Sequence, residues 1–117
     1  MRRGDIWTVL EGKDSAGKPR PAVVVQADDF DATDLITICV FTTDPTEAPM
    51  FRLRVEPSER KGPRSSSRLM VDKIITVSKS KLGERIGRLD NEDAVRLNRT
   101  AMVWLGFAAA PRTSRSQ

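Results

Sequence analysis

The sequence predicts a small, mainly β protein: a highly curved barrel of short strands with one α-helix packed against it near the C-terminus. Three observations support this. Short apolar runs rich in β-branched residues recur along the chain, and Gly-, Pro- and Asp-containing loops separate them. Only the segment after Asp90 has helical apolar spacing over several turns. A length of 117 residues fits one domain, which we expect over residues 1–108, with a basic, flexible tail over 109–117.

The first half of the chain contains four predicted strands. Residues 6–10, 21–26 and 35–43 are apolar and rich in β-branched side chains, which is typical of buried strands. Residues 51–55 (FRLRV) alternate apolar and basic side chains, which indicates a half-exposed strand. Residues 11–18 are rich in Gly, Lys and Asp and predict a mobile loop between the first two strands.

The second half begins with a polar, basic loop at 59–67. Residues 69–71 and 74–77 form two more short strands or one bent strand, with Asp72 between them. A helical turn at 78–82 and a last strand at 85–89 follow.

The predicted helix begins after Asp90, a favourable N-cap, and acidic residues in its first turn suit the positive end of the helix dipole. The apolar residues that recur at three- and four-residue steps, and so form one face that packs on the sheet, are Ala94, Leu97, Ala101, Trp104 and Leu105.

The composition excludes several classes of chemistry. The chain has no histidine and a single cysteine, Cys39, so zinc sites and Ser-His-Asp or Cys-His catalysis are excluded. We therefore expect no metal and no cofactor, and Cys39 as a reduced core thiol. The sequence has no apolar run near the ~20 residues that span a bilayer and no signal-peptide core, so we expect no membrane contact and a cytoplasmic location.

Charge is unevenly distributed. Residues 1–57 carry a net charge of −3, whereas residues 58–117 carry +7. A basic half of this kind indicates a polyanionic partner, either nucleic acid or an acidic peptide. A solvated basic surface with no partner explains the charge equally well.

Arg20 is the best candidate for phosphate chemistry. It stands between Pro19 and Pro21, and a residue before proline is restricted to extended geometry. The guanidinium is therefore held at the start of a buried strand, where its donors suit a phosphodiester whose charge grows in the transition state. The alternative is an ordinary surface arginine in a turn.

Other polar residues stand at strand ends or interrupt strands. Thr42 and Thr43 end the long strand, where a hydroxyl donates to a phosphate oxygen or simply favours the strand. Asp72 interrupts an apolar segment, as a base or as half of a structural ion pair. Ser67, the last of three serines, binds phosphate or makes a turn.

These residues fall into a family pattern. The motifs are RGDIW at 3–7, KPRPAVVV at 18–25, Thr42-Thr43, VDKIITV at 71–77 and WLGF at 104–107. In order and spacing they resemble the MazF/PemK toxins of bacterial toxin–antitoxin pairs, over roughly residues 2–107.

The resemblance implies a homodimeric, SH3-like β-barrel that cleaves single-stranded RNA and inhibits translation and growth until an antitoxin binds. It places the catalytic pair on Arg20 and Thr42, with Asp72 implicated in some members. The RNA contacts that it implies are Lys18, Thr43, Ser67 and Lys73.

Two departures from the family restrict the mechanism. Some relatives carry a histidine in the first loop and an arginine where this chain has Met70. RNA supplies its own nucleophile, the 2′-OH, so cleavage needs positioning, charge stabilisation and proton transfer. Arg20 stabilises the transition state, and Thr42 donates to a phosphoryl oxygen. The base is unassigned, with Asp72 a candidate only within hydrogen-bond reach of the site. The products carry a 2′,3′-cyclic phosphate, or its opened 3′-phosphate, and a 5′-hydroxyl.

Two other functions stay open at this point. The WLGF segment at 104–107 faintly resembles the ending of CcdB-type gyrase poisons, although Trp104 also fits the packing face of the helix. A non-catalytic RNA- or peptide-binding barrel is the third possibility. For the toxin, we expect an acidic, flexible antitoxin segment to share the RNA groove at a basic loop that contains Arg60, Lys61, Arg64 and Arg68.

Overall fold

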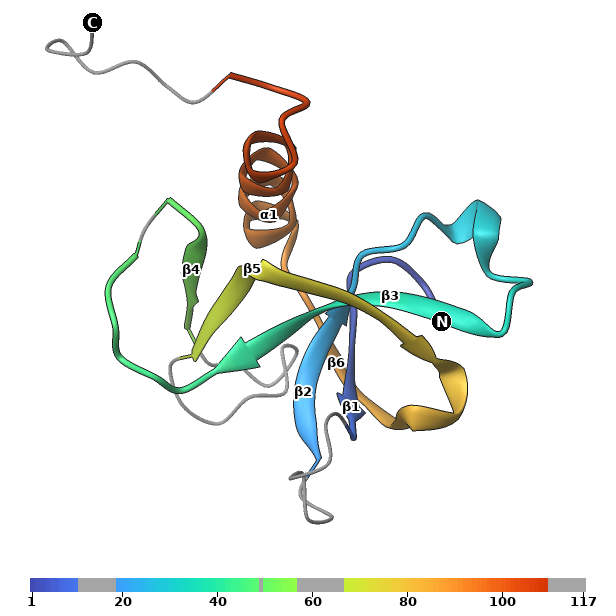
Figure 1. Cartoon of the computed structure of the whole chain (residues 1–117). Helices are drawn as coiled ribbons and strands as arrows, with labels where there is room; N and C mark the ends of the chain where they lie inside the picture. Colours follow the sequence, from blue (N-terminus) through green and yellow to red (C-terminus); the bar gives the residue numbers. More distant parts are fainter. Residues whose placement is uncertain (11–18, 49, 57–66, 110–117) are drawn as a thin grey trace, which may run out of the picture.

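The computed structural model describes residues 1–10, 19–48, 50–56 and 67–109 (Figure 1). Its strands are β1 (Asp5–Val9), β2 (Arg20–Val24), β3 (Leu35–Thr42), β4 (Arg52–Val55), β5 (Ser67–Ser78) and β6 (Leu82–Arg88). Within the same ranges, one α-helix, α1 (Asn91–Trp104), follows the strands, and two short 3-10 helices, η2 (Asp28–Phe30) and η3 (Lys79–Lys81), lie in turns. No helix in these ranges is both long enough and apolar enough to cross a membrane.

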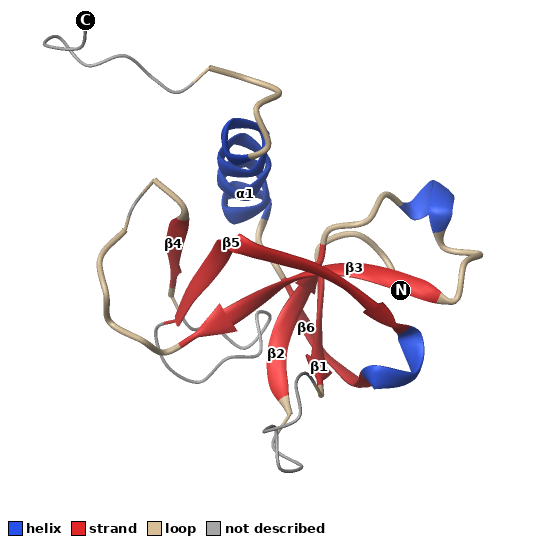
Figure 2. Cartoon of the chain, in the orientation of Figure 1, coloured by secondary structure: helices blue, strands red, loops and turns tan. Residues whose placement is uncertain are grey.

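The strands form one strongly curved antiparallel sheet in the order β4-β5-β3-β2-β1-β6 (Figure 2). The predicted mainly β fold with a C-terminal helix is confirmed. Within the described ranges β4 and β6 are the edge strands, so the hydrogen-bonding pattern leaves the curved sheet open.

The core lies on both faces of the sheet, because successive strand residues point to opposite sides. Val23 and Cys39 face the cluster that packs under α1, whereas their neighbours Val24 and Ile38 face a second cluster on the other side. Burial, and secondarily the negative charge of Asp72, raises the pKa of the Cys39 thiol to about 12. The predicted buried, reduced thiol is therefore confirmed.

Strand β5 resolves the alternative between two short strands and one bent strand. It is a single strand whose pairing with β3 shifts register: Phe41 lies opposite Leu69, but Cys39 lies opposite Ile74. The extra residues of β5 between these pairs make an irregular, bulged segment that contains Asp72. The bulge explains why a carboxylate interrupts an apolar run at this position.

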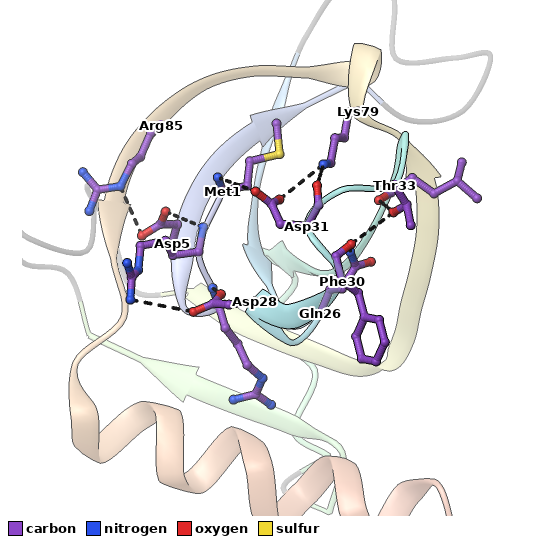
Figure 3. Close-up of polar contacts among 12 residues, drawn as sticks. Met1, Asp5, Gln26, Asp28, Phe30, Asp31, Thr33, Lys79 and Arg85 are labelled. Atoms are coloured by element: carbon purple, nitrogen blue, oxygen red, sulfur yellow. Dashed lines mark hydrogen bonds and ion pairs between the residues drawn. The ribbon is translucent and has the colours of Figure 1, made fainter.

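The opening RGD motif joins the N-terminus to the end of the sheet. Gly4 has a φ of 94°, a conformation that favours glycine. Asp5 is buried, accepts from the Arg2 N–H at 3.0 Å and pairs with Arg85 at 3.2 Å (Figure 3). It also pairs with Arg88 at 2.8 Å. Burial alone raises the pKa of Asp5, but these three contacts outweigh it, so the pKa lies below its usual value. The ionised Asp5 thereby ties the N-terminus to β6.

A second set of contacts in Figure 3 holds the acidic turn after β2. Asp31 lies 3.2 Å from the Lys79 Nζ and 3.8 Å from the N-terminal amine. Asp28 lies 3.8 Å from an Arg2 guanidinium nitrogen. Exposed ion pairs of this kind contribute only about 0–1 kcal/mol each, so they position the turn more than they stabilise the fold.

The helix lies over β4 and β5 (Figure 1) and docks through Leu97, which is buried, with Ala94 and Ala101 beside it. Asp90 occupies the N-cap position as predicted, although its side chain makes no capping hydrogen bond to the helix. The prediction that Trp104 and Leu105 pack on the sheet is only partly confirmed, because both are about half exposed. Trp104 makes a tilted ring contact with Phe51, at 5.4 Å between ring centroids.

Candidate active site

A cavity of about 350 Å³ lies where β2 begins, β3 ends and β5 begins. Antiparallel pairing of β3 with both neighbours brings these three strand ends together. The residues that line it are Arg20, Pro21, Phe41, Thr42, Thr43, Asp44 and Ser67. Four of the predicted site residues therefore share one cavity, although they are far apart in the sequence.

Arg20 is the first residue of β2 and pairs with Val9 of β1. Its side chain is exposed and makes no hydrogen bond or ion pair with any other described residue. The adjoining Pro19 and Pro21 restrict the backbone on both sides. The geometry thus presents a guanidinium whose donors are available to a ligand in the cavity.

Thr42 ends β3 with its hydroxyl in a defined hydrogen bond. The Thr42 Oγ1 accepts from the backbone N–H of Asp44 at 3.1 Å. The Thr42 hydroxyl donates to no other described residue, so its hydrogen is available to a ligand in the cavity. Thr43 is exposed on the cavity wall, and Ser67 is buried at the start of β5.

Asp44 lines the same cavity and is the residue that sequence reasoning missed. Its Oδ1 accepts from the Thr46 N–H at 2.9 Å and from the Thr46 hydroxyl at 2.7 Å. These two bonds, followed by the positive charges of Arg52 and Arg68, hold the pKa of Asp44 below its usual value. The Asp-Pro-Thr sequence directly after the Thr-Thr strand end is a turn signal that points to such a side-chain-capped turn.

Two arginines, Arg52 and Arg68, contact the segment 44–47. The Nη1 of Arg68 donates to the carbonyl oxygen of Asp44 at 3.5 Å, and its Nη2 pairs with Glu47 at 3.1 Å. Arg52 lies between two carboxylates, 3.8 Å from Asp44 and 3.6 Å from Asp72. Arg68 lies in β5 and not in the predicted basic loop, and it is only 12% exposed; its contact with an antitoxin stays a prediction.

The remaining predicted residues lie elsewhere. Asp72 sits in the β5 bulge beside Arg52 and does not line the cavity, so the structural ion pair that the sequence allowed is present. Lys73 is exposed on β5 and is also outside the cavity lining. The other predicted basic residues lie outside the described residues: Lys18, Arg60, Lys61 and Arg64. No group of three or more carboxylate or thiol side chains within the described ranges is arranged to hold a metal.

The fold and this site define a class of small toxins. Residues 2–105 match the family described as PemK-like, MazF-like toxins of type II toxin–antitoxin systems. The chain belongs to this family, and the predicted resemblance is confirmed. A relative from Mycolicibacterium smegmatis, a probable endoribonuclease MazF, is 47% identical over 108 residues, which cover 92% of this chain and 99% of the relative.

Solved structures share the fold at lower sequence identity. A mycobacterial endoribonuclease in complex with its cognate antitoxin has a TM-score of 0.76 and 20% identity, covering 94% of this chain and 99% of that one. A MazE–MazF complex from Deinococcus radiodurans has a TM-score of 0.73 and 17% identity, covering 92% and 98%. The family match favours the ribonuclease-type toxin over the CcdB-type alternative.

Proposed function

We propose that this chain is the toxin of a type II toxin–antitoxin pair and cleaves single-stranded RNA in the cavity between β2, β3 and β5. One observation carries the proposal: Arg20 and Thr42 line the same cavity, and Arg20 makes no hydrogen bond or ion pair with another described residue. The name of the 47% identical relative supports the same activity.

The chemistry follows from these two groups. The RNA 2′-OH loses its proton as its oxygen bonds to the adjacent phosphorus, and a 2′,3′-cyclic phosphate forms. The bond from phosphorus to the 5′-oxygen breaks, and that oxygen takes up a proton to leave as the 5′-hydroxyl. Arg20 binds the phosphoryl oxygens on which negative charge grows, and Thr42 donates a hydrogen bond to one of them. Arg20 is not the base, because a guanidinium carries only hydrogen-bond donors and has no site that accepts a proton.

The other predicted residues support the site in different ways. We assign RNA contacts to Thr43 and Ser67 on the cavity wall and to Lys73 outside it. We also assign one to Lys18, which lies outside the described residues. Asp72 acts through its pairing with Arg52 rather than on the substrate. We further propose that residues 1–108 carry the whole activity as one domain, with 109–117 as a tail, and that the toxin acts in the cytoplasm, where its RNA substrates are.

We also propose a homodimer. The end of α1 and the residues after it expose Met102, Trp104, Leu105 and Phe107, and Phe107 is 77% exposed. A cluster of exposed apolar side chains is typical of a surface that another protein covers. Light scattering checks this directly: a solution mass equal to one chain contradicts the dimer.

For the antitoxin, we propose an acidic, flexible segment that competes with RNA. The net charge of +7 over residues 58–117 favours both polyanions. Competition between antitoxin and RNA in a binding assay is the direct check, and simultaneous binding of both contradicts the shared groove.

Cleavage is expected to need no divalent metal. The nucleophile belongs to the RNA, and Arg20 supplies the positive charge that a metal supplies in other nucleases. The test incubates the purified protein with single-stranded RNA in excess EDTA, beside the same reaction with magnesium. Cleavage of equal extent supports the proposal. Cleavage that disappears with EDTA and returns with magnesium contradicts it, and binding without cleavage in both reactions identifies a non-catalytic RNA-binding protein.

A further inference from the structure

Two side chains of opposite charge line the cavity, and only one of them suits a phosphate. Arg20 lines it as an exposed cation, and Asp44 lines it as an exposed anion. An RNA phosphate is attracted by the guanidinium and repelled by the carboxylate. The RNA backbone therefore runs on the Arg20 side, and the group that meets Asp44 is another part of the nucleotide.

Hydrogen bonds and an ion pair fix the orientation of the Asp44 carboxylate. Its Oδ1 takes two hydrogen bonds from Thr46, and its Oδ2 faces Arg52 at 3.8 Å. Its backbone N–H and carbonyl are fixed by Thr42 and Arg68. A side chain oriented so completely offers a ligand an acceptor in a defined position rather than a mobile charge.

The state of this carboxylate argues against a role as the general base. The hydrogen bonds from Thr46, with the nearby arginine charges, lower the pKa of Asp44, so at neutral pH it is ionised and holds a proton weakly. A general base works best when its pKa lies near the working pH. A permanently ionised carboxylate is instead a strong hydrogen-bond acceptor, and its natural partner is an N–H donor.

We propose that Asp44 is a specificity-determining residue that accepts a hydrogen bond from the exocyclic amino group of a nucleobase next to the cleaved bond. This inference rests on the proposed ribonuclease function, and it specifies which nucleobases the site selects. In single-stranded RNA the Watson–Crick edges are open to such contacts. Cytosine, adenine and guanine carry an exocyclic amino group there, and carboxylates accept from such groups in nucleic-acid complexes. Uracil carries the carbonyl oxygen O4 where cytosine carries its amino group, and the carboxylate repels that oxygen.

The test compares matched oligoribonucleotides that differ in one base beside the cleaved bond. A randomised pool first defines the sequence that the wild type cleaves. Cytosine is then compared with uracil, and adenine with purine riboside, at each of the two flanking positions. For the wild type we expect a preference for the amino-bearing base at one of these positions. Asp44→Asn is expected to reduce that preference about tenfold while keeping cleavage of the remaining sequences.

Glu47→Gln is the matched control, because Glu47 is a carboxylate of the same segment that pairs with Arg68 but does not line the cavity. It removes the same charge and is expected to leave the preference unchanged. The proposal is overturned if Asp44→Asn keeps the full preference, if Glu47→Gln loses it equally, or if Asp44→Asn slows cleavage of all sequences alike.

Binding of 2′-O-methyl oligonucleotides, which lack the nucleophile, separates this inference from the proposed function. If the wild type cleaves no RNA, the proposed ribonuclease is wrong. Tighter binding of the amino-bearing oligonucleotide, lost in Asp44→Asn, still supports base selection by Asp44, and equal binding of both oligonucleotides contradicts it.

Discussion

Replacing Arg20 with Ala is expected to lower the rate of RNA cleavage by roughly 10²–10³-fold, the usual cost of losing one donor that stabilises transition-state charge. The fold should be unaffected, because the Arg20 side chain is exposed and contacts no other described residue by hydrogen bond or ion pair. Cleavage of a labelled single-stranded RNA gives the rate, and urea unfolding gives the stability.

Arg54→Ala is the matched control for this change. Arg54 is an exposed arginine on β4 that pairs with Glu56 at 2.8 Å and does not line the cavity. It removes the same charge, so a loss of cleavage through weaker general attraction to RNA appears in both variants. The proposed mechanism is wrong if Arg20→Ala keeps full activity, or if Arg54→Ala loses as much.

Leu97→Ala is expected to give the largest loss of stability among single changes in the helix. Leu97 is 3% exposed and joins α1 to the core beneath it. Truncating a buried leucine removes its transfer free energy and leaves a cavity, which together lower the free energy of unfolding by about 2–5 kcal/mol. Urea denaturation followed by circular dichroism measures this loss.

Val95→Ala serves as the comparison on the same helix, because Val95 is 49% exposed. Its effect on the free energy of unfolding is expected to stay within about 0.5 kcal/mol, as for most surface changes. Equal losses in the two variants would mean that α1 does not dock through Leu97.

The strands could be predicted from the sequence because their signals are local. The predicted ranges 6–10 and 35–43 differ from β1 and β3 by a residue or so at each end. Arg20 could be found for the same reason, since two flanking prolines mark it in the sequence itself. Thr42 needed only the end of an apolar run.

The contacts that complete the site are not local, and the sequence could not supply them. Asp44 lies in the cavity because Arg52 and Arg68, from β4 and β5, hold its segment against the end of β3. Asp72 was a plausible base in the sequence, but the β5 bulge brings it to Arg52 instead. Neither the bulge nor the pairing of distant strands has a signature in a short window.

Trp104 illustrates a different limit. Its spacing from Leu97 and Ala101 fits one helical face, yet it is about half exposed, whereas Leu97 is buried. Periodicity states which residues share a face and not how far the covering surface extends.

Attack by the RNA 2′-OH is tested most directly with an RNA that carries a single 2′-deoxynucleotide on the 5′ side of the cleaved bond. The deoxy sugar removes the nucleophile and leaves the base, the phosphate and the neighbouring contacts in place. In excess EDTA, we expect cleavage of the all-ribose RNA to a 2′,3′-cyclic phosphate, or its opened 3′-phosphate, and a 5′-hydroxyl. We expect the substituted RNA to be bound but not cleaved at that bond. Cleavage of the substituted RNA at the same bond, or products that carry a 5′-phosphate, would contradict the proposal that Arg20 and Thr42 promote attack by the RNA's own 2′-OH.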